Sequence, residues 1–326
     1  MKTLKNTIIA LLILCSTQVW SQSILITPEY DTPEKNTWSG ALYTGIDMQN
    51  TSGGIFLGLN GRYTLGKIAT FSTNLSYDLT RLVSSGSVLS FDEELLNQLP
   101  AYKDFQFRGT FHFKDEMGTL KSKVKLGRRN EANATGTGGR TVKYSTQCET
   151  KVRNVYGITA SLNVQSRLAG NQDSFQVIRV KNALGEDPGN INVAVGQNNL
   201  VLGAGLQIGQ YTWFKGQFSA VAANINKTRR VRKSLVANFE LLYALAISTG
   251  DEAYFKKDAN TALETYKIDE VEKRRLGFRI TTDYGMNKPG GFQRLELGWR
   301  PGVWAPNANS KFLNQAYFVY ALGIGF

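Results

Sequence analysis

Two side chains in the sequence are of the types that most often catalyse reactions or bind metals, His112 and Cys148. His112 is the single histidine, and the only other cysteine, Cys15, lies near the N-terminus. Hydrolases pair a histidine with a serine or a carboxylate partner, and zinc requires a cluster of ligands. Neither residue is surrounded by such a motif. We therefore expect no enzyme, no catalytic residue, no metal site and no cofactor.

A second chemical feature is a dense basic cluster at 227–233, K-T-R-R-V-R-K. Runs of this kind bind nucleic acid, anionic lipid headgroups or acidic proteins, or are simply solvated. The export signal described below argues against nucleic acid. We expect the cluster to occupy a periplasmic turn and to meet a partner there through Lys227, Arg229, Arg230, Arg232 and Lys233.

A third set of cations is recognised only when the strands that carry it are considered. In 105–114, phenylalanines at 105, 107, 111 and 113 alternate with polar or charged residues, and 120–126 and 156–165 alternate in the same way. Side chains of a strand point to opposite faces in turn. One face therefore collects a basic cluster of Arg108, Lys114, Lys121, Lys123, Lys125, Lys143 and Lys151.

The last eleven residues, A-Y-F-V-Y-A-L-G-I-G-F, alternate most clearly. Phe318, Tyr320, Leu322, Ile324 and Phe326 are bulky and apolar, and the residues between them are mostly small. This pattern resembles the closing strand of Gram-negative outer-membrane β-barrels. The resemblance implies that these five residues form an assembly signal read by the barrel-assembly machinery.

Alternating segments recur along the whole chain and predict fourteen strands. They lie near 38–49, 54–65, 67–79, 104–114, 119–128, 141–152, 155–167, 190–197, 199–209, 211–225, 233–248, 274–284, 291–300 and 316–326. The connections between them sort into short and long ones by turns, as in barrels with periplasmic turns and long external loops. We expect an all-β, up-and-down, transmembrane antiparallel β-barrel over 38–326, in which the last strand pairs with 291–300 and 38–49.

The N-terminus supports an exported protein. Lys2 and Lys5 precede a short apolar run, and Ser21 suits a cleavage site, which together indicate a signal peptide over 1–21. Residues 22–37 then form a periplasmic tail. A start at Gln22 resembles signal peptides of Bacteroidota. These features place the chain in the cell outer membrane, among its lipids and lipopolysaccharide.

Two functions remain open. A polar lumen rich in Lys and Arg predicts a porin-like transport channel that prefers anions. The alternative is a non-conducting structural or accessory barrel, similar to those of type IX secretion and gliding complexes, although the Asn-Pro-rich signature of that family is missing after Gln22. By alternation, cations such as Arg62, Arg279 and Arg294 point into the lumen, as do several acids. A network of ion pairs that lets no solute pass therefore also agrees with the sequence. Those acids are Asp47, Glu149, Glu240, Asp283 and Glu296.

Overall fold

The part of the chain that the structure describes folds almost entirely into β-strands. The computed structural model describes residues 25–29, 37–49, 52–79, 103–132, 139–170, 178–189, 191, 193–220, 225–255, 263–286, 290–303 and 316–325. The predicted signal peptide and Phe326 lie outside these ranges. Within them, no helix is long and apolar enough to cross a membrane.

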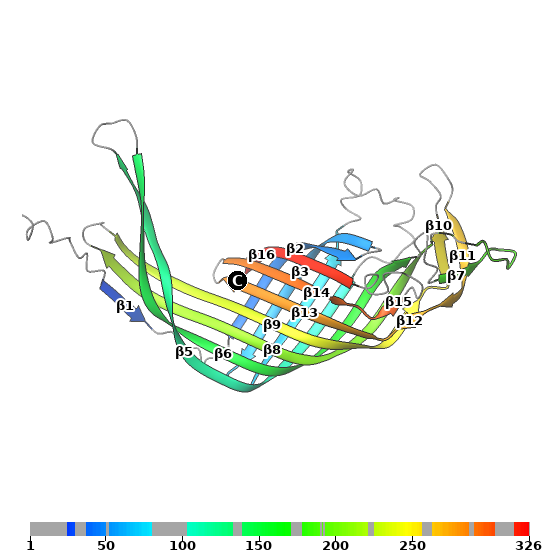
Figure 1. The fold of residues 1–326 in the computed structure, drawn as a ribbon, viewed down its shortest axis with the longest axis horizontal. Helices are drawn as coiled ribbons and strands as arrows, with labels where there is room; N and C mark the ends of the chain where they lie inside the picture. The colour runs from blue at the N-terminus through cyan, green and yellow to red at the C-terminus, as the bar shows by residue number, and fades with distance from the viewer. Residues whose placement is uncertain are drawn as a thin grey trace, which may run out of the picture. The chain divides into compact units, whose positions relative to one another are not determined.

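Ten antiparallel strands form a closed ring in the order β6-β5-β4-β3-β2-β16-β14-β13-β9-β8, and the pairing of β6 with β8 closes it. Figure 1 shows β16, β14, β13 and β9 side by side in this order. The strands are β2 (Thr37–Gln49), β3 (Ser52–Leu65), β4 (Ala69–Asp78), β5 (Lys103–Ala132), β6 (Gly139–Gly170), β8 (Ala194–Ala220), β9 (Ile225–Thr249), β13 (Leu276–Met286), β14 (Gly290–Trp299) and β16 (Ala316–Gly325).

The first and last strands of the ring are neighbours, which confirms the predicted closure. β16 pairs with β14 along its whole length, and Val319 lies opposite Glu296. On its other side β16 pairs with β2, where Val319 lies opposite Asp47. An antiparallel barrel was thus predicted correctly.

The predicted count of fourteen strands was wrong, because three long strands had been divided. Segments 104–114 and 119–128 are both parts of β5, which has 30 residues, and 141–152 and 155–167 are both parts of β6, which has 32. The three segments between 190 and 225 are parts of β8. Polar or glycine-containing stretches such as 115–118 resemble turns, yet the strand continues through them.

With ten strands, the connections sort by length more clearly. One end of the ring has only short ones, at 66–68, 133–138, 221–224 and 287–289. The other end has 50–51 and four long ones, at 79–102, 171–193, 250–275 and 300–315. The stretch 129–140, predicted as an external loop, therefore belongs to the end with the short turns.

The chain divides into two compact units, and β5, β6, β8 and β9 contribute residues to both. Unit 1 comprises 1–31, 119–151 and 213–231. It includes a short strand, β1 (Leu25–Glu29), which pairs antiparallel with β8 so that Thr27 lies opposite Gln217. The segment predicted as a tail therefore contains a paired strand. Unit 2 comprises the rest of the chain and contains the barrel.

The long connections of unit 2 build a small sheet of their own (Figure 1). It consists of β7 (Ile178–Lys181), β10 (Glu252–Phe255) and β11 (Glu264–Val271), and it joins β8 where Tyr254 pairs with Ala194. Ile178, Val180, Val193, Val195 and Ala253 form its apolar core. A second short pair joins β12 (Lys273–Arg274) to β15 (Gly302–Val303).

Candidate functional site

The interior face of the barrel is buried and mostly polar, with one apolar cluster on β2, β3, β14 and β16, and the outer face is largely apolar and exposed. In β5, Gln106, Arg108, Thr110 and His112 are at most 7% exposed, whereas the phenylalanines between them are exposed. The same alternation occurs along β2, β3, β6, β8, β14 and β16. A soluble β-sheet protein has the opposite arrangement, because its apolar faces pack together and its polar faces meet water.

The interior is occupied by a set of buried ion pairs, the interior ion-pair network. Glu240 of β9 is fully buried and accepts hydrogen bonds from two arginines of other strands. Arg108 lies 2.6 Å and Arg279 2.7 Å from its carboxylate. Arg279 also donates to Asn163 at 2.9 Å and to Ser161 at 3.2 Å. Four strands are thereby connected across the interior.

A second group of pairs surrounds Arg294 of β14. Its guanidinium lies 3.0 Å from Glu296 and 3.6 Å from Asp283. Asp283 also pairs with Arg62 at 2.9 Å, and Glu296 accepts a hydrogen bond from the Tyr317 hydroxyl at 2.8 Å. These contacts join β3, β13, β14 and β16.

A third group is built on Asp47 of β2. Arg167 lies 3.0 Å and Arg300 2.9 Å from this carboxylate, and Arg167 also reaches Asp104 at 3.2 Å. The Arg300 guanidinium stacks 3.4 Å from the centre of the Tyr317 ring. A cation placed over an aromatic face is stabilised further by the charge distribution of the ring.

The interior ion-pair network is close to electrically neutral. Every buried arginine that the structure describes has a carboxylate partner: Arg62, Arg108, Arg153, Arg167, Arg279, Arg294 and Arg300. Their partners are Asp47, Asp104, Asp115, Glu240, Asp283 and Glu296. Seven arginines against six carboxylates leave a net charge of +1. The described interior is therefore a paired network and not a basic surface.

Among the described side chains of the predicted basic cluster, only Arg108 is a buried interior residue. Lys121 and Lys123 are exposed and belong to unit 1, so they are not among the buried residues of the barrel interior. Lys114 is exposed and pairs with Glu116, and Lys151 is half-buried in unit 1. The acid Glu149, also predicted to face inward, is exposed. The side chains of Lys125 and Lys143 lie outside the described ones.

The basic cluster at 227–233 lies within β9, which begins at Ile225, so its assignment to a turn was wrong. Arg232 is half-buried and Lys233 is exposed. The side chains of Lys227, Arg229 and Arg230 lie outside the described ones.

The two residues considered for catalysis or metal binding belong to different units. His112 is buried in the barrel, and its Nε2 atom lies 3.0 Å from the Thr70 hydroxyl. Cys148 is buried in unit 1. Among the described residues, no three His, Cys, Asp or Glu side chains gather as a metal site would require.

Alternation along each strand was sufficient to place several network residues inward: Arg62, Asp47, Glu240, Arg279, Asp283, Arg294 and Glu296. It missed three of the arginines. Arg153 had been placed in a predicted turn, although it lies inside β6 and pairs with Asp115. Arg167 and Arg300 stand at the ends of predicted strands. Extending the two-residue period by one step from Gln165 and from Gly298 would have found both.

Outward-facing side chains of the ring are large and apolar on every strand. On β16 they include Phe318, Tyr320, Leu322 and Ile324, four of the five residues of the predicted assembly signal. Near the end with the short turns, Trp38 is 78% exposed and stacks on Tyr63, with ring centres 4.6 Å apart. Phe71, Phe111 and Phe113 are exposed in the same half of the barrel.

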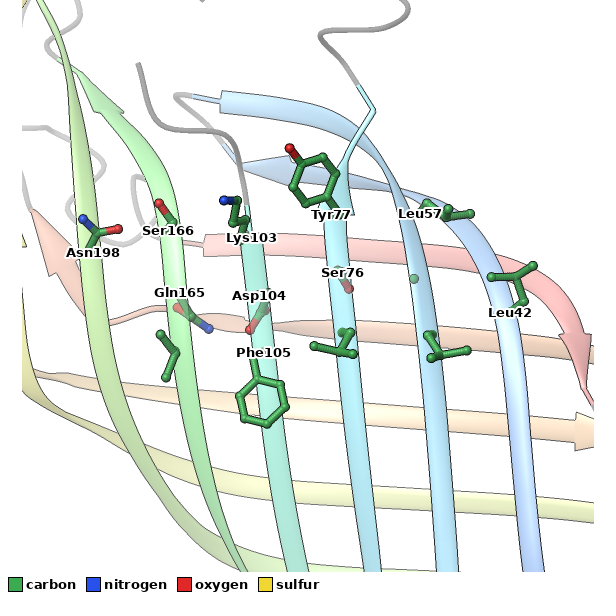
Figure 2. A pocket seen from close by; sticks show the side chains of 14 residues that line it. Leu42, Leu57, Ser76, Tyr77, Lys103, Asp104, Phe105, Gln165, Ser166 and Asn198 are labelled. Carbon is green, nitrogen blue, oxygen red and sulfur yellow. The ribbon is translucent and has the colours of Figure 1, made fainter. Parts of the chain in front are cut away.

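A groove of about 640 Å³ lies on the outer face of unit 2 near the end with the long connections. Exposed apolar side chains line it: Leu42, Leu57, Leu59, Leu75, Phe105 and Val164. Tyr77, Lys103, Ser166 and Asn198 add polar groups, and Figure 2 shows them in a row across β4, β5, β6 and β8. The Lys103 ammonium lies 5.6 Å from the centre of the Tyr77 ring.

Comparison with known proteins adds little to this geometry. No protein-family model and no curated protein matches the chain. Among solved structures, a Salmonella typhi OmpF complex with daunomycin is similar at 9% identity and a TM-score of 0.19, over 92% of this chain and 99% of that one. A loop-deletion mutant of OmpT, an outer membrane protein of Vibrio cholerae, is similar at 9% identity and a TM-score of 0.16, over 90% and 99%. TM-scores this low do not establish a shared fold. The class defined by the chain itself is a closed ten-stranded barrel with an ion-paired interior and an apolar exterior.

Proposed function

We propose that this chain is an outer-membrane β-barrel of a Gram-negative bacterium. The observation that carries the proposal is the inverted arrangement of its side chains. Strands can cross a bilayer only in a closed ring, because every backbone N–H and C=O must be paired there. An apolar outer belt with aromatic residues near its edge is typical of such barrels. The predicted signal peptide and closing strand agree with this location.

Within that class, we propose a non-conducting barrel that anchors unit 1 and serves as a structural or accessory component of the envelope. Barrels of eight strands are filled by their own side chains, whereas those of sixteen or more leave an aqueous channel. Ten strands lie near the filled end of this range. The network supports the same conclusion, because ions that cross the interior would have to separate buried pairs, and it offers no covalent chemistry.

The competing candidate is the porin-like, anion-preferring channel. It is favoured by the net charge of the chain, +12, and by the single excess positive charge among the paired interior residues. The two candidates differ in whether the interior contains a continuous water path. They are distinguished by electrical recordings and not by binding assays.

Conductance in planar bilayers tests the choice. We expect the folded wild-type protein to be silent, and the double variant Glu240→Ser, Arg279→Ser to conduct, because it removes a central pair that links β9 and β13 to β5 and β6. Heat-modifiable migration on gels would show that both proteins are folded. Steady, anion-selective conductance of the wild type would instead support the channel.

Reversing Lys121 and Lys123 to Glu provides a matched control. Both lysines are exposed in unit 1, so we expect the reversal to leave any conductance and its ion preference unchanged. If these two substitutions reversed the ion preference, both residues would have to line the conduction path.

A further inference from the structure

The groove on the outer face has the chemistry of a site for an amphiphile. Its volume is within the range of small-molecule sites. Most of its accessible lining is apolar, which suits acyl chains. Its exposed or half-buried polar side chains Tyr77, Lys103, Ser166 and Asn198 lie at one end, and the inward-facing Ser76, Asp104 and Gln165 also line it. Figure 2 shows Asn198, Ser166, Lys103 and Tyr77 in one row that Leu57 continues, and Phe105 below Lys103 on the same strand with Asp104 between them.

The polar row coincides with one end of the barrel. Tyr77 and Lys103 flank the long connection between β4 and β5, and Ser166 and Asn198 flank the one between β6 and β8. Leu59, Leu75 and Phe105 lie one step further toward the middle of the strands, whereas Leu57 is level with Tyr77 and Lys103. In a bilayer this order matches a lipid with its headgroup at the interface and its chains beside the belt.

The charge of Lys103 points to the kind of headgroup. Its side chain is exposed and contacts the Tyr77 ring, and the described part of the chain provides it with no carboxylate partner. The buried arginines that the structure describes in the barrel are all paired with carboxylates. The Lys103 ammonium, in contrast, is available to bind an anionic headgroup. Lysine binds phosphate groups as a point charge. Ser166 and Asn198 add hydrogen-bonding groups beside it.

We propose that this groove binds a phosphate-bearing, acylated lipid of the membrane leaflet at the long-connection end. The phosphate contacts Lys103, and the acyl chains lie on Leu59, Leu75 and Phe105. This inference rests on the proposed function, since it requires the outer face to meet lipid. It assigns a specific lipid-binding site, whereas the apolar belt alone would be solvated by lipids without specificity.

Native mass spectrometry of the full chain in detergent tests the site. Phosphatidic acid, with a terminal phosphate and two acyl chains, is titrated against phosphatidylcholine. We expect the wild type to bind phosphatidic acid more tightly. Lys103→Ala should weaken that binding about fivefold, the effect of one basic residue at a lipid headgroup, and leave phosphatidylcholine unaffected. Lys103→Arg should retain most of the preference.

Lys233→Ala is the matched control, because Lys233 is also exposed but lies near the opposite end of the barrel, and it should not change binding. Equal binding of the two lipids, or full binding by Lys103→Ala, would overturn the proposal. Displacement of phosphatidic acid by millimolar inorganic phosphate would also overturn it, since the site would then recognise a free anion. Insertion into liposomes, followed by protease protection, tests the proposed function separately from the lipid site in the groove. A barrel that inserts without lipid preference refutes only the groove, whereas failure to insert refutes the proposed function.

Discussion

Glu240 is a fully buried carboxylate that alone compensates two arginines, Arg108 and Arg279. Replacing it by Gln leaves both guanidinium groups buried without a counter-charge. Breaking a buried pair by removing one partner typically costs about 3–5 kcal/mol. We therefore expect Glu240→Gln to lower the free energy of unfolding by this amount, measured by urea titration in lipid vesicles.

The exposed pair of Lys114 and Glu116 is the control for that experiment. Their side chains are 53% and 56% exposed, and pairs of this kind contribute about 1 kcal/mol or less. Glu116→Gln should therefore be nearly neutral. Equal losses in the two variants would mean that Glu240 is not shielded from water as its surroundings indicate.

A different constraint acts at Gly323 of β16, beside β2. A Cβ atom at this position would meet the backbone of Leu42 and Tyr43. We expect Gly323→Val to separate the two strands and to abolish heat-modifiable migration, the sign of a closed barrel. Leu322→Val, which changes an outward side chain next to it, should leave that migration intact.

The strands differ in whether the barrel can fold after parts of them are deleted. Residues 119–151 form the part of β5 and β6 that belongs to unit 1, and an added Cβ at Gly118 would lie 3.9 Å from the Val152 carbonyl oxygen. The two ends of this segment are thus close together. Deleting 119–151 and joining the ends with a short Asn-Gly turn should leave a barrel that still migrates as a folded species on unheated gels.

Removal of the β13–β14 hairpin, 276–299, is the contrasting deletion. It takes two strands out of the ring together with Arg279, Asp283, Arg294 and Glu296, so we expect no folded species. If both deletions abolished folding, the barrel would depend on unit 1 for its assembly.

At the same scale, sequence reasoning identified the strands better than their ends. Alternation fixed the faces of β2, β3, β4, β13, β14 and β16 because each has one buried and one exposed side. It failed between Lys114 and Lys121, where nearly every described side chain is exposed and the two-residue period disappears. Without a buried face, a continuous strand has the composition of a turn. The partners across the interior could not be predicted, since they depend on which strands lie opposite one another.

For the whole molecule, the surplus positive charge predicted from the sequence is not where the pattern placed it. The buried arginines are offset by carboxylates, and Lys121 and Lys123 belong to unit 1. Net charge therefore says little about the interior of this barrel. The silent wild-type barrel expected in planar bilayers is the prediction that follows at this scale.

The pairing of β2 with β16 also has a consequence for the order of folding. Ala41 lies opposite Gly325, so the contact that completes the ring joins nearly the two ends of the chain. Contacts between residues so distant in sequence form late and slow the overall rate. The backbone edge of β2 must stay unpaired until the final ten residues arrive, and during that interval it can pair with a wrong strand or another chain. The pairing of β16 with β2 thus sets how long this edge stays open during folding.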